Sequence, residues 1–161
     1  NDVCYPTILV ENALYDLDIL IKERDVKLTT EIADGVPNFL GDREQFERAL
    51  VNLLENAIKF TLEDSHICIA VYSQHDRVMF EIKDNGIGIP EELQDRVFDR
   101  FYRGKQFGVE HVTGSGLGLS LVKTIVENHK GKIWLESEPN QGTTFFISIP
   151  SFNSYSHKGK Q

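Results

Sequence analysis

Residues 78–90, VMFEIKDNGIGIP, are the most informative stretch for the fold of this chain, because the strand pattern there places a carboxylate on the side that faces the core. Apolar residues alternate along its first half, and on a period of two the next residue on the apolar side is Asp84. An ionised carboxylate in an apolar layer costs several kcal/mol or shifts its pKa, so we expect Asp84 to meet a hydrogen-bond donor. The glycines that follow, Gly86 and Gly88, indicate that something other than a side chain approaches the backbone.

The composition is that of a globular domain. The 161 residues are 40% hydrophobic and 26% charged, with no apolar run long enough to cross a bilayer. A net charge of −8 argues against general nucleic-acid binding, because phosphate backbones are held by basic surfaces. Cys4 and Cys68 make no disulfide framework, which favours a reduced compartment. The chain begins with Asn1 rather than Met, so we expect a fragment of a larger protein.

Periodicity predicts an α+β fold. Helices are expected over residues 7–24, 43–60 and 117–130, and strands over 27–33, 66–74, 77–84, 132–138 and 143–150. Asp42 is the expected N-cap of the second helix, and the breaker-rich stretch 36–42 precedes it. Two hairpins without regular βαβ alternation predict a two-layer sandwich, a mixed sheet covered on one face by three main helices. We expect one domain over residues 1–150 and a disordered polar tail over 151–161.

The second helix carries a polar edge beside its apolar stripe. At about 100° per residue, Asn52, Asn56 and Lys59 fall on one flank of the stripe. Two carboxamides and an ammonium on that edge can bind a ligand between helix and sheet, and the ammonium suits a phosphate. A hydrated boundary face is the alternative interpretation.

Glycines open the third helix in GSGLGLSLVK, residues 114–123. Backbone N–H groups at a helix N-terminus bind anions, and the glycines let a phosphate come close. Leu119 stands where a dinucleotide fingerprint has its third Gly or Ala, and no GxxxxGK[ST] motif occurs in the chain.

The long loop between the hairpins, from Pro90 to Ser115, is unusual in so small a domain and predicts a lid. Within it, Phe98 and Phe101 are spaced to anchor one helical turn, and the cations able to reach a phosphate are Arg100, Arg103 and Lys105. A surface turn with two core aromatics is the alternative.

The order of these motifs resembles the catalytic and ATP-binding domain of sensor histidine kinases. The matching segments are NLLENAIKFT (52–61), DNGIGIP (84–90), FDRFYRG (98–104), GSGLGL (114–119) and GTTF (142–145). The resemblance implies a Bergerat-type sandwich, with ATP and Mg²⁺ bound between the helices and a mobile lid.

The resemblance also assigns roles. Asp84 is expected to accept a hydrogen bond from the adenine amine, with the Thr143 hydroxyl in the same network, and Asn56 to bind Mg²⁺ through its side-chain oxygen. Asn52, Asn56 and Lys59 are the expected catalytic residues. The predicted nucleotide site comprises Asn52, Asn56, Lys59, Phe60, Asp84, Gly86, Gly88, Ile89, Val97, Arg103, Lys105, Gly114, Ser115, Gly116, Leu117, Gly118, Leu119 and Thr143.

One position separates related families. DNA gyrase, mismatch-repair ATPases and a heat-shock chaperone family carry a Glu one turn before the Mg²⁺-binding Asn, where this chain has Asn52, which cannot act as a carboxylate base. Phosphoryl transfer to a protein is therefore favoured over ATP hydrolysis. A nucleotide-sensing module without transfer activity and a hydrolytic ATPase are the alternatives.

No histidine of the chain has the sequence context of a phosphoacceptor, and His75 is expected in an exposed turn. The expected partners are therefore a histidine-bearing dimerisation domain, of the same or a partner kinase chain, and the receiver domain of a response regulator. We expect a cytoplasmic domain with no nucleic-acid partner and no direct membrane contact, in a parent protein that is either soluble or membrane-anchored.

Overall fold

The structure is a computed structural model, and it describes residues 1–100 and 118–153. Its strands are β1 (Asp2–Cys4), β2 (Lys27–Ile32), β3 (Phe39–Gly41), β4 (His66–Gln74), β5 (Arg77–Asp84), β6 (Lys132–Glu138) and β7 (Gly142–Pro150). Its helices are α1 (Pro6–Asp16), α2 (Asp18–Glu23), α3 (Arg43–Lys59), the 3-10 helix η1 (Glu91–Arg96) and α4 (Gly118–Asn128).

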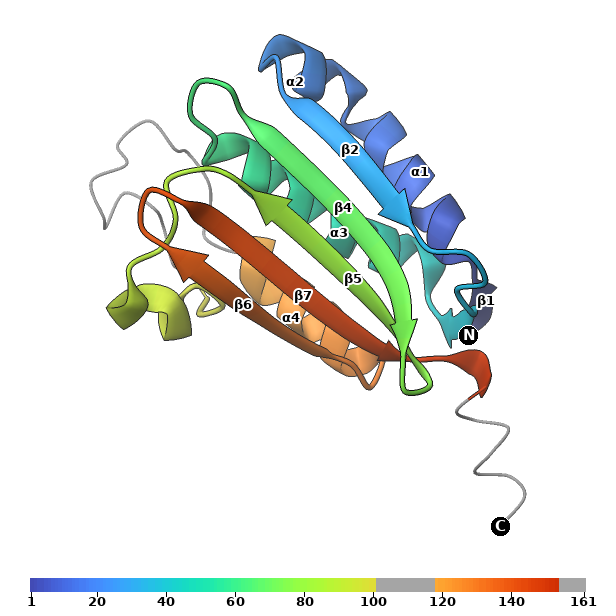
Figure 1. Cartoon of the computed structure of the whole chain (residues 1–161). Coiled ribbons are helices and arrows are strands. Elements are labelled where there is room, and N and C mark those ends of the chain that lie inside the picture. Colours follow the sequence, from blue (N-terminus) through green and yellow to red (C-terminus); the bar gives the residue numbers. More distant parts are fainter. Residues whose placement is uncertain (101–117, 154–161) are drawn as a thin grey trace.

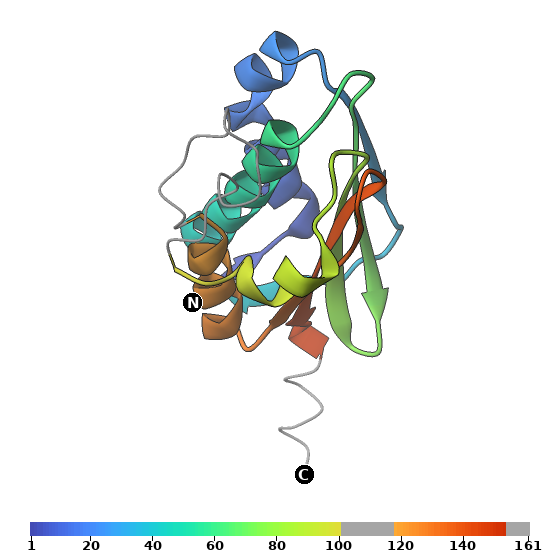
Figure 2. The same cartoon turned by 90° about the vertical axis from the view of Figure 1, so that its left-hand side faces the viewer.

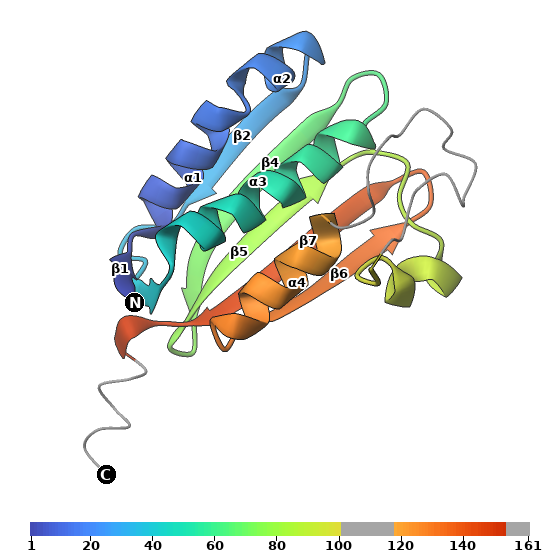
Figure 3. The same cartoon turned by 180° about the vertical axis from the view of Figure 1, so that it is seen from behind.

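A five-stranded mixed sheet forms one layer, in the order β2-β4-β5-β7-β6 (Figure 1). The pairing of β2 with β4 is parallel, and the other three pairings are antiparallel. Figure 2 shows the helices on one side of the sheet, and Figure 3 shows α1, α3 and α4 lying across that face. The predicted α+β two-layer sandwich with three main helices is confirmed.

The core lies between α3 and the inner face of the sheet. The predicted stripe of α3 is buried, with Phe46, Leu53 and Ala57 at 0% exposure and Leu50 at 1%. The rings of Phe46 and Phe80 pack with their centroids 5.2 Å apart, which joins helix to sheet. The predicted N-cap is also confirmed, because Asp42 Oδ1 accepts a hydrogen bond from the Gln45 amide at 3.1 Å.

His129 connects α4 to the start of α3. Its Nδ1–H donates to the Ile125 carbonyl at 2.7 Å, and its Nε2 accepts the Asp42 amide at 2.9 Å. The side chain is buried, and its ring lies edge-on to Phe46 with 5.5 Å between centroids. Since one ring nitrogen donates and the other accepts, the buried imidazole is neutral.

The first 42 residues differ from the prediction in two places. The expected helix over 7–24 is divided at Leu17 (φ −101°, ψ 5°), the residue between α1 and α2. Its buried side chain belongs to the core. Within the predicted breaker stretch 36–42, β3 pairs antiparallel with β1. Strands of three residues are too short for a period of two to be recognised.

Residues just past the expected domain boundary at residue 150 are hydrogen-bonded to the domain. The Ser151 amide donates to the Asp76 carbonyl at 2.9 Å, and the Phe152 amide donates to the Asn38 carbonyl at 2.7 Å. These two residues, expected in the tail, are therefore tied to the domain, and residues 154–161 lie outside the described part. None of the helices in residues 1–100 and 118–153 is long and apolar enough to cross a membrane.

Candidate functional site

Asp84 ends β5 and is buried, with 5% exposure. Its Oδ1 accepts the Gly86 amide at 2.8 Å and the Thr143 amide at 3.3 Å. Burial raises the pKa of this carboxyl from 3.8 to about 6, although the two backbone hydrogen bonds oppose the rise. Within the described residues, Oδ2 accepts no hydrogen bond. The predicted inward carboxylate is thus present, and two of its donors belong to the protein itself.

The glycines after Asp84 are explained by close approach of the chain's own backbone. A Cβ on Gly86 would lie 2.3 Å from the Phe60 carbonyl oxygen. Gly88 has φ +72°, and a Cβ there would lie 2.1 Å from the Glu138 carbonyl oxygen. The interpretation that a non-side-chain group approaches this backbone is right, but that group is the protein's own main chain. Nucleotide contact by these glycines stays a prediction.

This glycine loop also meets the end of α3. The Ile87 amide donates to the Phe60 carbonyl at 3.2 Å, so the C-terminal turn of α3 is tied to the loop beside Asp84. Asn52, Asn56 and Lys59 are all half-buried on this half of the helix. Figure 3 shows the end of α3, the end of β5 and the start of α4 at the same end of the sheet. Polar side chains of α3 and the Asp84 carboxylate therefore share one end of the molecule.

The segment after the glycine loop packs against the sheet. Val97 is 2% exposed and belongs to the core, and Ile89 packs partly buried against it. The Phe98 ring lies edge-on to Phe145 with 6.0 Å between centroids, as expected of an anchor. The Lys123 ammonium of α4 lies 6.0 Å from the centre of the Phe98 ring, within the range of a cation–π contact.

The α4 end of the predicted site is described only in part. At the start of α4, Gly118 is exposed, and a Cβ added to it would meet no heavy atom within 4 Å, whereas Leu119 is 9% exposed against the core. The remaining predicted residues of this region lie outside the described residues: Phe101, Arg103, Lys105, Gly114, Ser115, Gly116 and Leu117.

Two polar residues outside the predicted set, Ser137 and Gln94, join the hydrogen-bond network around Thr143 and Ile89. Ser137 Oγ lies 2.8 Å from Thr143 Oγ1 and 2.9 Å from the Gly142 carbonyl oxygen, and it accepts the Ile89 amide at 2.8 Å. Gln94 of η1 donates from Nε2 to the carbonyls of Ile89 at 2.9 Å and Ser137 at 3.1 Å. Strand parity was the available signal for Ser137, because it shares the less exposed face of β6 with Ile133 and Leu135.

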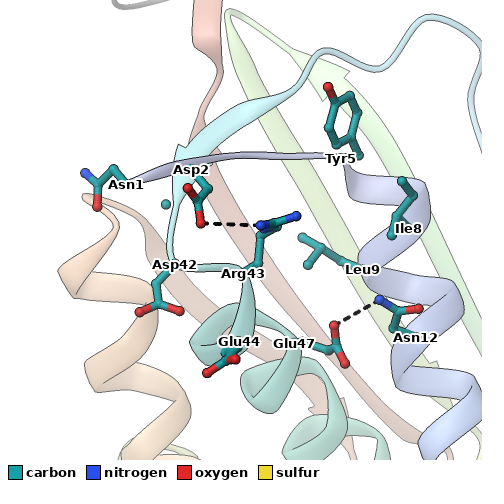
Figure 4. A pocket seen from close by; sticks show the side chains of 11 residues that line it. Asn1, Asp2, Tyr5, Ile8, Leu9, Asn12, Asp42, Arg43, Glu44 and Glu47 are labelled. Carbon is teal, nitrogen blue, oxygen red and sulfur yellow. Dashed lines mark hydrogen bonds and ion pairs between the residues drawn. The ribbon is translucent and has the colours of Figure 1, made fainter.

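A surface pocket of about 500 Å³ lies at the opposite end of α3, between its first turns and α1 (Figure 4). An ion pair of 3.6 Å between Arg43 and Asp2 and a hydrogen bond of 3.2 Å from Asn12 to Glu47 cross it. Of the predicted site residues in the described part of the chain, none lines this pocket. The candidate nucleotide site is therefore a separate region.

Comparison with known proteins agrees with this arrangement. A family model described as histidine kinase-, DNA gyrase B- and HSP90-like ATPase matches residues 41–153. The adaptive-response sensory kinase SasA of Prochlorococcus marinus (strain MIT 9303) is 36% identical over 143 residues, which are 88% of this chain and 38% of that protein. This chain therefore spans well under half of that relative.

Solved structures agree as well. The nucleotide-free catalytic domain of the histidine kinase ThkA superposes with a TM-score of 0.80 at 28% identity, covering 93% of this chain and 97% of that one. ThkA in complex with the response regulator protein TrrA matches with a TM-score of 0.77 at 26% identity, over 93% of this chain and 41% of that one. The chain belongs to the family of histidine kinase-, DNA gyrase B- and HSP90-like ATPases, as the ATP-binding catalytic domain of a sensor histidine kinase.

Proposed function

We propose that this domain binds Mg-ATP and transfers the γ-phosphoryl group to a histidine on a separate dimerisation and phosphoacceptor domain. The observation that carries the proposal is the buried Asp84 carboxylate, whose Oδ2 accepts no hydrogen bond from the described residues, at the same end of the sheet as the polar edge of α3. A buried carboxylate with one oxygen left for a ligand suits a ligand that donates a hydrogen bond.

Adenine recognition follows from this carboxylate. Oδ1 is occupied by the Gly86 and Thr143 amides, which hold the carboxylate in place and leave Oδ2 for the exocyclic amine of adenine. Guanine presents a carbonyl at that position, and two facing acceptors reduce affinity by orders of magnitude. The domain is therefore expected to select ATP and ADP over guanine nucleotides.

Phosphate binding is assigned to the polar edge of α3 and the start of α4. Asn56 would supply an oxygen to Mg²⁺, Lys59 would supply a cation, and the backbone amides around Gly118 and Leu119 would bind the phosphates. Bound Mg²⁺ would neutralise charge on the phosphate oxygens during transfer. Among residues outside the described part, Arg103 and Lys105 would add cations, and Gly114, Ser115, Gly116 and Leu117 would line the glycine-rich loop.

Transfer is favoured over hydrolysis by the residue one turn before Asn56. Asn52 is half-buried on the same helix and cannot take a proton from an attacking water. The proposed acceptor nitrogen belongs to a histidine on the dimerisation domain of the same or a partner kinase chain, where a P–N bond would form as the bond from the γ-phosphorus to its bridging oxygen breaks and ADP leaves. A response regulator receiver domain is the proposed next acceptor, consistent with the complex known for ThkA.

The test is phosphate transfer from γ-labelled ATP with Mg²⁺. The chain alone should release phosphate very slowly and label itself negligibly, because it has no carboxylate base at position 52 and no histidine in an acceptor context. Adding the cognate helical domain should place acid-labile phosphohistidine on that partner. Asn56→Ala should abolish the transfer, whereas Asn128→Ala, an exposed amide at the far end of α4, should not.

The other outcomes separate the alternative functions. Rapid phosphate release by the chain alone would overturn the proposal in favour of a hydrolytic ATPase. Tight ATP binding without transfer to the correct partner would instead indicate a regulatory nucleotide-sensing module. The proposal includes a cytoplasmic location, where ATP is available and the two free cysteines stay reduced.

A further inference from the structure

We propose that Ser137 is a positioning residue that determines purine specificity, by fixing the Thr143 hydroxyl as a hydrogen-bond acceptor beside Asp84. The inference rests on the proposed function, because it concerns the adenine side of that site. Thr143 is the cross-strand partner of Asp84, is 6% exposed, and gives its amide to Asp84 Oδ1. What its hydroxyl offers to a ligand depends on where its proton goes.

The direction follows from counting protons at Ser137. A serine hydroxyl donates once and accepts up to twice. The Ile89 amide uses one acceptor site, and the Gly142 carbonyl, which has no proton to give, takes the single donated proton. The remaining contact, 2.8 Å to Thr143 Oγ1, then needs a proton from Thr143. In this arrangement all three contacts of Ser137 are hydrogen bonds.

The reverse arrangement leaves a contact without a proton. If Ser137 donated to Thr143, its oxygen would face the Gly142 carbonyl at 2.9 Å with no hydrogen between them. Two facing acceptors at that distance repel, so the Thr143 proton is committed to Ser137. Thr143 Oγ1 can then only accept from a ligand, as Asp84 Oδ2 does. Two adjacent acceptors favour an amine and disfavour a carbonyl.

Gln94 holds the frame in which Ser137 works. Its side-chain Nε2 donates to the backbone carbonyls of Ile89 and Ser137, at 2.9 and 3.1 Å. Gln94 therefore links the end of the glycine loop to β6 next to the Ser137 hydroxyl. Because Ser137 Oγ also accepts the Ile89 amide, the end of the loop carrying Gly86 and Gly88 is bonded directly to β6. Ser137 thus sets both the hydroxyl direction and the position of the loop.

The experiment measures Kd for ATP and GTP by calorimetry in the wild type and in Ser137→Ala. Removal of the serine hydroxyl frees the Thr143 proton to point toward a carbonyl, so the ratio of the GTP to the ATP Kd should fall by about tenfold, the value of one hydrogen bond. Ser137→Thr keeps the hydroxyl and should keep the ratio. Thr144→Ala, a neighbouring hydroxyl facing the other side of the sheet, is the matched control.

A second measurement does not depend on nucleotide. Hydrogen exchange at the Ile89 amide should become faster in Ser137→Ala and stay slow in Ser137→Thr. If Ser137→Ala does not fold, Ser137→Cys makes the same test, because a thiol is a weak donor and acceptor and should lower the ratio in the same direction.

The outcomes separate this inference from the proposed function. A wild type that binds ATP and GTP equally would overturn both. A selective wild type with an unchanged ratio in Ser137→Ala would overturn only the role of Ser137, and equal weakening of both nucleotides would reduce it to a structural residue.

Discussion

Asp84→Asn removes the charge of a buried carboxylate while keeping its shape. The wild-type carboxyl is ionised at pH 8, because its pKa, raised from 3.8 chiefly by burial, is about 6. A rise of about two pKa units corresponds to roughly 3 kcal/mol by which ionisation destabilises the folded state. An uncharged Asn can keep its Oδ1 on the Gly86 and Thr143 amides, so the variant should be more stable than the wild type by up to about 3 kcal/mol.

The sign of the pH dependence follows from the direction of the shift. Because the folded pKa lies above the unfolded one, protonated Asp84 favours the folded state, and the penalty is absent below about pH 4. It grows between about pH 4 and pH 6 and is complete above that range. Urea unfolding of both proteins at pH 4 and pH 8 should therefore show equal free energies of unfolding at pH 4 and a more stable variant at pH 8.

Nucleotide binding should change in the opposite direction. In the variant, the side-chain amide NH₂ takes the place of Oδ2 and faces the adenine amine. Two donors then face each other, so ATP affinity should fall by about a hundredfold or more. In the wild type, ATP affinity should fall by about tenfold per pH unit below pH 6, as Asp84 becomes protonated. Calorimetric titration measures both effects, and Asp95→Asn, an exposed carboxylate in η1, is the matched control.

Two results would refute this reasoning. An Asp84→Asn protein that unfolds more easily at pH 8 would mean that the charge stabilises the empty fold. Unchanged ATP affinity in a folded variant would mean that Asp84 does not bind the adenine amine.

Two further predictions concern the framework of the site. Gly88→Ala should destabilise the domain by about 3 kcal/mol or more, because the residue has a left-handed φ and its new Cβ would overlap a backbone carbonyl. At Gly118 a Cβ has open space, so Gly118→Ala should leave the midpoint temperature of thermal unfolding within a few degrees of the wild type. His129→Ala should lower the free energy of urea unfolding by about 3 kcal/mol, because it leaves a cavity and an unpaired Asp42 amide. The control His75→Ala, at an exposed position, should change that free energy by about 0.5 kcal/mol or less. Equal effects of the two substitutions would contradict the linking role of His129.

Much of the fold could be predicted because its elements are long enough to show their period. The α3 stripe, the two hairpins and the inward position of Asp84 follow from spacings of 3.6 and 2 residues along the chain. The turn at His75 and Asp76 was also predicted, and both residues have the positive φ of a tight hairpin, +49° and +59°. The three-residue strands β1 and β3 were missed because each is too short to show its period and because they pair with residues distant in the sequence, such as Val3 with Leu40.

The candidate site divides along the same line. Sequence order by itself determined that a carboxylate, a polar helix edge and glycine-rich loops occur in the succession typical of this ATPase family, because each motif is contained in a few consecutive residues. Only the tertiary structure decided what those groups contact. The second amide on Asp84 comes from Thr143 on β7, the carbonyls close to the glycines come from Phe60 and Glu138, and Ser137 joins β6 to the loop. These contacts depend on strand register and on how α3 and the β6–β7 hairpin dock, and neither is encoded in the local period of the chain.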